Sequence, residues 1–110
     1  MFQLNLLTKE GKMACAEISV MPVGIGVGIS EHVAEAYRVA KKSRLKVELT
    51  PMGTVLEGNT DEIFRLAREM HQSLFTKGAR RVITHLKIDE RKDKVQGLED
   101  RVKAVLEKAK

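Results

Sequence analysis

The sequence is poor in the residues that build cross-linked, metal-rich or aromatic structures. Its 110 residues include one cysteine, two prolines and no tryptophan, and aromatic side chains make up only 4%. A single cysteine excludes an internal disulfide framework and any multi-cysteine metal site. The scarcity of aromatic side chains argues against base stacking on the protein surface as a means of binding nucleic acid.

Long apolar runs are also missing. The longest candidate, residues 20–29, is interrupted by Pro22 and three glycines, far short of the roughly 18 residues of a membrane-spanning helix. Residues 1–12 lack a basic start followed by an apolar stretch, so we expect no secretory signal, a cytoplasmic location and no membrane partner. With 43% hydrophobic residues the chain is apolar enough to fold, and its length suits one domain.

The net charge of +5 is unevenly distributed. Residues 1–76 hold nine basic and nine acidic side chains, whereas residues 77–110 hold eleven basic and six acidic ones. A basic segment suggests nucleic-acid binding. The acidic groups interspersed in it, and the missing aromatic residues, lead us to expect no nucleic-acid partner.

Hydrophobic periodicity predicts the order β-α-β-β-α-β followed by a helix. Residues 13–21 alternate as a half-buried strand, residues 45–50 and 54–57 form two short strands around a Pro-Met-Gly turn, and residues 82–88 form a fourth strand. We interpret Ser30 and Asn59 as N-caps of the first two helices, the latter paired with Glu62, and Gly78 as the end of the second. A third helix is predicted after Asp93, capped together with Gln96.

This order predicts an α+β fold, a ferredoxin-like βαββαβ sandwich with an additional C-terminal helix, over residues 13–110 as a single domain. The first strand is expected beside the third and fourth, with both crossover helices on one face. The opposite face is predicted to carry a mixed set of side chains, namely Cys15, Glu17, Ser19, Lys46, Glu48, Thr50, Ile83, His85 and Lys87.

The two ends of the chain differ in their patterns. The apolar residues between Val95 and Ala109 recur at steps of three and four, a narrow seam that favours packing on another helix and hence self-association. Residues 1–12 show no decisive pattern, which leaves a flexible N-terminal extension, an extra edge strand, or sequence before the true start, since Met13 is a plausible start.

Arrangements typical of enzymes and metal sites are incomplete. The glycines at 24, 26 and 28 lie between a strand and a helix, but the third glycine of a dinucleotide fingerprint and the Gly-Lys-Ser/Thr of a P-loop are missing, which favours a structural loop. The three histidines lack metal-ligand spacing, and Cys15 has no nearby histidine. We therefore predict no enzyme, no catalytic residue, no cofactor and no metal site.

Carboxylates and hydroxyls around the Pro-Met-Gly turn offer more chemistry. Thr50 and Thr54 flank the turn, and Glu17 and Glu57 lie on strands expected to be neighbours. A carboxylate accepts a hydrogen bond from a ring amino group, hydroxyls pair with ring nitrogens, and the Met52 thioether covers a ring face. Ordinary cross-strand pairing of these glutamates with lysines explains the pattern equally well.

Three segments of the sequence resemble one known family. They are residues 17–24 (EISVMPVG), residues 48–58 (ELTPMGTVLEG), and Arg81-Val82 with residues 87–91 (KIDER). Together they resemble the MTH1187/YkoF-like family of thiamine-binding proteins, and the resemblance covers about residues 13–108. The block at 48–58 is its most specific part.

The resemblance implies a ferredoxin-like homo-oligomer, a dimer or homotetramer, that binds thiamine or its hydroxymethylpyrimidine moiety without catalysis. The ligand-binding residues it implies are Ser19, Thr50, Met52, Thr54 and Glu57, with Glu17 and Asp89 as further candidates. In this hypothesis the aminopyrimidine donates to Glu57, the three hydroxyls hold it, and Met52 covers its ring. The alternative is a structural or regulatory homo-oligomeric interaction protein with no small-molecule ligand.

Overall fold

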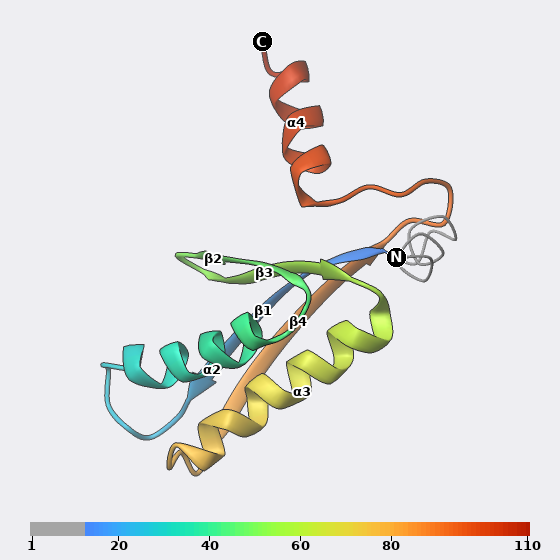
Figure 1. The fold of residues 1–110 in the computed structure, drawn as a ribbon. Helices are drawn as coiled ribbons and strands as arrows, with labels where there is room; N and C mark the ends of the chain where they lie inside the picture. The colour runs from blue at the N-terminus through green and yellow to red at the C-terminus, as the bar shows by residue number, and fades with distance from the viewer. Residues whose placement is uncertain (1–12) are drawn as a thin grey trace.

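The computed structural model describes residues 13–110 and confirms the predicted order of elements (Figure 1). The hypotheses for residues 1–12 lie outside the described residues. The elements are β1 (Ala14–Pro22), α2 (Ser30–Lys42), β2 (Lys46–Thr50), β3 (Gly53–Gly58), α3 (Thr60–Thr76), β4 (Val82–Glu90) and α4 (Leu98–Lys108).

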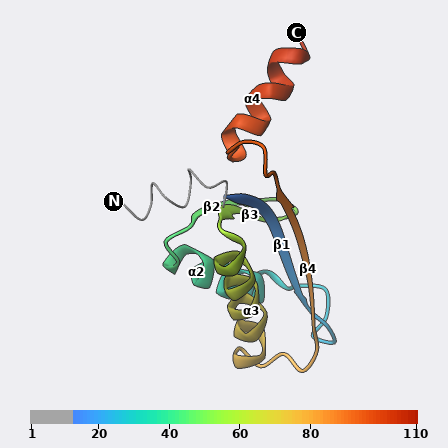
Figure 2. The ribbon, with the colours of Figure 1, turned by 90° about the vertical axis from the view of Figure 1, so that its right-hand side faces the viewer.

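The four strands form one antiparallel sheet in the order β2-β3-β1-β4. The helices α2 and α3 cover one face of this sheet, and α4 projects beyond its end (Figures 1 and 2). This arrangement is the predicted ferredoxin-like α+β sandwich with an added C-terminal helix. The central position predicted for the first strand is confirmed, because β1 pairs with β3 on one side and β4 on the other.

Strand alternation divides the side chains between two faces. On β1, the even-numbered residues from Ala14 to Val20 point toward the helices and are almost fully buried. They pack against Leu56 of β3 and against Ile63, Met70 and Leu74 of α3, each at most 1% exposed. The pairing register puts every residue predicted for the opposite face on that face, which we call the open face.

The ends of α3 are as predicted. Asn59 Oδ1 accepts a hydrogen bond from the Glu62 backbone N–H at 2.8 Å, so Asn59 is the N-cap. At the other end, Gly78 has a φ of +114°, which favours glycine, and its N–H donates to the Phe75 carbonyl at 3.0 Å.

The starts of the other two helices were predicted wrongly. Ser30 is already the first residue of α2, Ile29 holds the cap position, and no side chain among residues 13–110 caps this helix. Asp93 does not begin the last helix, because it forms an ion pair with Arg91 instead. The helix α4 starts five residues later, where Asp100 accepts from the Gly97 N–H at 3.0 Å.

None of the helices within residues 13–110 combines the length and the apolar character that crossing a membrane requires.

Candidate functional site

The β2–β3 hairpin is shorter than the strand beside it. β1 pairs with β4 from Ala14 to Pro22, but it pairs with β3 only from Ala14 to Ile18. Beyond Ile18, β1 therefore has a strand neighbour on one side only among residues 13–110. The tight turn between β2 and β3 lies next to this unpaired stretch.

A cleft of about 390 Å³ occupies this place. Its size falls within the range of small-molecule sites. Its walls come from the end of β1, the hairpin turn, the start of α2 and single residues of α3 and β4. The lining residues are Ile18–Met21, Ile29, Val33, Ala36, Leu49–Thr54, Met70 and His85.

Four of the sequence-predicted ligand residues meet in this cleft: Ser19, Thr50, Met52 and Thr54. Thr54 pairs with Ile18 on the helix-covered side and is 4% exposed, whereas Met52 at the turn is 81% exposed. The Thr50 hydroxyl fixes the turn, because it donates to the Gly53 carbonyl at 2.8 Å and accepts from the Met52 N–H at 3.3 Å. One lone pair of that hydroxyl remains for a ligand.

The other three predicted residues do not line the cleft. Glu57 lies four residues further along β3 than Gly53, roughly 13 Å away at about 3.3 Å per strand residue. Asp89 lies in the same cross-strand row as Glu57, with Cys15 between them. Glu17 lies between the two regions on the open face, where a Cβ added at Gly53 would meet its Cγ at 3.4 Å.

His85 lines the cleft, although the sequence analysis did not include it among the ligand-binding residues. It is exposed on β4 directly opposite Ser19. Alternation alone had placed both residues on the same face. Their direct pairing depends on the register between β1 and β4, which no motif in the sequence defines.

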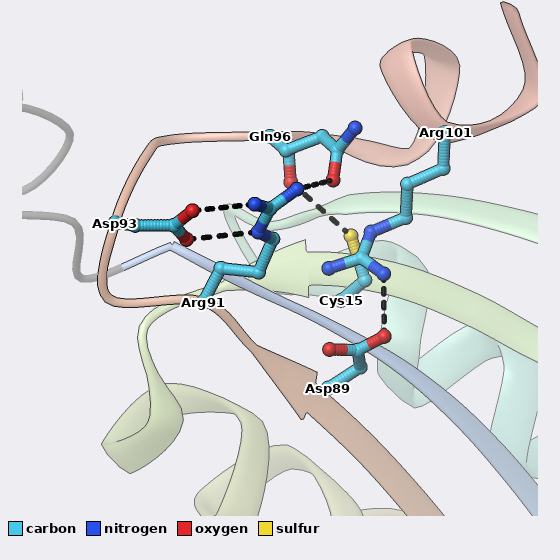
Figure 3. A network of polar contacts seen from close by, with 6 residues as sticks. All are labelled: Cys15, Asp89, Arg91, Asp93, Gln96 and Arg101. Carbon is cyan, nitrogen blue, oxygen red and sulfur yellow. Dashed lines mark hydrogen bonds and ion pairs between the residues drawn. The ribbon is translucent and has the colours of Figure 1, made fainter. Parts of the chain in front are cut away.

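The row that contains Glu57 anchors the C-terminal helix. Four residues of the open face, one from each strand, contact α4 or the segment leading into it. The contacts are Glu57 Oε2 accepting from the Leu98 N–H at 2.8 Å, Asp89 Oδ2 with Arg101 at 2.5 Å, Lys46 Nζ with Glu99 at 2.8 Å, and the Cys15 thiol donating to the Gln96 carbonyl at 3.7 Å. Figure 3 shows the Cys15 and Asp89 side of this row, with Arg91 held by Asp93 and Gln96.

Replacing Glu57 by alanine should loosen α4. The carboxylate accepts from a backbone N–H at the positive end of the helix dipole, and an eleven-residue helix is marginal without tertiary contacts. We expect the amides of α4 to exchange with solvent at least tenfold faster, measured by hydrogen–deuterium exchange. Glu69→Ala, at an exposed position on α3 away from α4, is the matched control. Unchanged α4 exchange in the Glu57 variant would show that Glu57 is not an anchor.

Cys15 should make stability fall at alkaline pH. Burial raises the pKa of its thiol above the ordinary value of 9.0, while the neighbouring Arg101 guanidinium acts in the opposite direction. The folded protein then holds the thiol proton more tightly than the unfolded chain. The resulting stability is fully present below pH 9 and is lost as the pH rises through the folded pKa.

Urea unfolding of the native protein and of Cys15→Ala between pH 7 and pH 10.5 measures this contribution. We expect the alanine variant to lose less stability above pH 9 than the native protein loses. If the free energy of unfolding changes with pH in the same way for both proteins, the Cys15 thiol does not cause the alkaline loss of stability.

The fold places the chain among the ferredoxin-like α+β proteins, and comparison with known proteins is more specific. The chain belongs to the family described as thiamine-binding protein, whose family model matches residues 16–106. This confirms the resemblance found in the sequence motifs.

The relatives match nearly the whole chain. UPF0045 protein MJ1052 of Methanocaldococcus jannaschii is 47% identical over 90 residues, which cover 82% of this chain and 89% of the relative. A UPF0045 protein of Methanothermobacter thermautotrophicus is 39% identical over 98 residues, covering 87% and 99%.

Solved structures agree with the fold. The crystal structure of MJ1052 matches with a TM-score of 0.81 and 45% identity, over 86% of this chain and 96% of that one. A crystal structure from Thermotoga maritima matches with a TM-score of 0.74 over 84% and 98%; its 24% identity bears on the fold alone.

Proposed function

We propose that this protein binds thiamine or its hydroxymethylpyrimidine moiety in the cleft beside the β2–β3 turn, without catalysing a reaction. The observation that carries the proposal is the convergence of Ser19, Thr50, Met52 and Thr54 on one cleft of about 390 Å³. Membership of a family described as thiamine-binding supports it.

The cleft suits a flat heterocycle with a polar edge. Ile18, Val33 and Leu49 give it apolar walls. Met52 extends from the turn at its mouth, where a thioether covers a ring face. Ser19 and His85 offer a hydroxyl and an imidazole nitrogen to ring substituents, and Thr50 offers a lone pair.

Titration calorimetry tests this proposal. We expect thiamine, thiamine phosphate and hydroxymethylpyrimidine to release or absorb heat with one saturable site per chain. The isolated thiazole alcohol is the control and should bind more weakly than the pyrimidine. No heat from any pyrimidine ligand at millimolar concentration, with a protein whose circular dichroism shows it is folded, would overturn the proposal.

We further propose that the protein is a homo-oligomer, a dimer or tetramer, that buries the apolar side chains of α4. Val102, Val105 and Leu106 are 59–66% exposed on this helix. These residues equally favour the second candidate function, an interaction protein whose assembly is its only role.

Leu106→Glu should lower the assembled mass measured by light scattering, with the exposed Lys103→Glu as a charge control. Thiamine binding retained in the dissociated variant would favour the binding function over the pure interaction protein. An unchanged mass would contradict assembly through α4.

A further inference from the structure

At the cleft, the main chain of β1 has an edge that no other strand of the described part of the chain pairs with. The Val23 N–H donates to the Arg81 carbonyl at 2.8 Å, in register with the β1–β4 ladder. Backbone groups of successive strand residues point to opposite sides, so the odd-numbered residues of β1 bond to β4 and the even-numbered ones face β3. Ile18 meets Thr54 of β3 in this way. The next even-numbered residue, Val20, has no β3 residue beside it.

The main-chain N–H and C=O of Val20 that face the β3 side therefore have no strand partner within the part of the chain that the structure describes. Val20 is 7% exposed, and within residues 13–110 its main chain has no hydrogen bond outside the sheet ladder. Main-chain groups that no protein group, water or ligand pairs with are rare, because each costs about the free energy of a lost hydrogen bond. The cleft is lined by four consecutive residues of β1, Ile18–Met21, so it borders the edge of the strand as well as its side chains.

We propose that the main-chain N–H and C=O of Val20 form hydrogen bonds with the edge of the bound pyrimidine ring. This inference rests on the proposed function and specifies how the pyrimidine is recognised. An extended residue offers one donor and one acceptor side by side on the same edge. An aminopyrimidine offers the complementary pair, an amino N–H that donates and the adjacent ring nitrogen that accepts.

Hydrogen bonding by the Val20 main chain also supplies an acceptor that Glu57 does not provide in the cleft. Glu57 was the expected acceptor for the amino group, and its carboxylate is occupied by the Leu98 N–H at the other end of the sheet. The Val20 carbonyl supplies an acceptor within the cleft itself. Its N–H adds a main-chain donor for the adjacent ring nitrogen, beside the Ser19 hydroxyl that also lines the cleft.

Amide hydrogen exchange followed by NMR tests the inference on the unaltered protein. Without ligand, the Val20 amide should exchange faster than those of Ser19 and Met21, which bond to β4. Saturation with hydroxymethylpyrimidine should slow Val20 at least tenfold more than it slows Ser19 and should shift the Val20 amide proton downfield. Taking the ratio to Ser19 removes the general stabilisation that any ligand confers.

The isolated thiazole alcohol should leave that ratio unchanged. If calorimetry shows pyrimidine binding but the ratio of the Val20 and Ser19 exchange rates does not change, recognition by the Val20 main chain is overturned. The proposed function is then left intact. Equal protection of Val20 by the thiazole alcohol would also overturn recognition by the Val20 main chain. Absence of any pyrimidine heat would overturn both proposals together.

Discussion

Leu56→Ala should lower the free energy of unfolding by about 2–5 kcal/mol, whereas Leu49→Ala should lower it by less than about 1.5 kcal/mol. The two leucines lie on neighbouring strands and point to the same face of the sheet. Leu56 is fully buried under the helices, so its truncation leaves a cavity in the core. Leu49 is 55% exposed and lines the cleft.

Urea denaturation of both variants measures the difference. Leu49→Ala should also weaken pyrimidine binding while leaving the fold intact, since it removes part of an apolar wall. Equal losses of stability in the two variants would contradict the distinction between core and cleft.

Ser19→Trp should reduce thiamine affinity on the order of 100-fold. Ser19 lies opposite His85 and next to Gly53, where an added Cβ would be 3.6 Å from the Ser19 Cβ. An indole at this position competes with the ligand for the cleft. Calorimetry measures the loss, and circular dichroism reports whether the variant is folded.

Lys87→Trp is the matched control for this variant. Lys87 is exposed on the open face two residues from His85, and it does not line the cleft. We expect its thiamine affinity to stay within about threefold of the native value. Similar losses in both variants would mean that the ligand lies elsewhere on the open face.

Periodicity was sufficient to predict the sheet and its two faces. The alternation in residues 13–21 separates the buried residues Ala16 and Ile18 from Glu17 and Ser19, and the structure keeps that division. The unequal lengths of the first strand and the hairpin were also visible in the sequence. That difference leaves room for the cleft, which the sequence pattern did not predict.

The remaining differences come from tertiary contacts that have no local signal. Glu57 was expected in the ligand site because it sits in the same motif as Thr54, yet it binds the start of a helix forty-one residues later. Asp93 is a residue type that often caps helices, but here its carboxylate forms an ion pair with Arg91 in the segment that precedes α4. Ser30 is replaced as the cap by Ile29, and the structure shows no side-chain reason for it.

A chemical-shift map of the nitrogen-15-labelled protein during titration with thiamine shows whether the ligand binds in the cleft beside the β2–β3 turn. We expect the largest amide shifts at Ser19, Val20, Met52, Thr54 and His85, with small shifts in α4. Largest shifts centred on Glu57, Asp89 and Leu98 would contradict this expectation, because they would place the ligand at the α4 anchor instead of the cleft beside the β2–β3 turn.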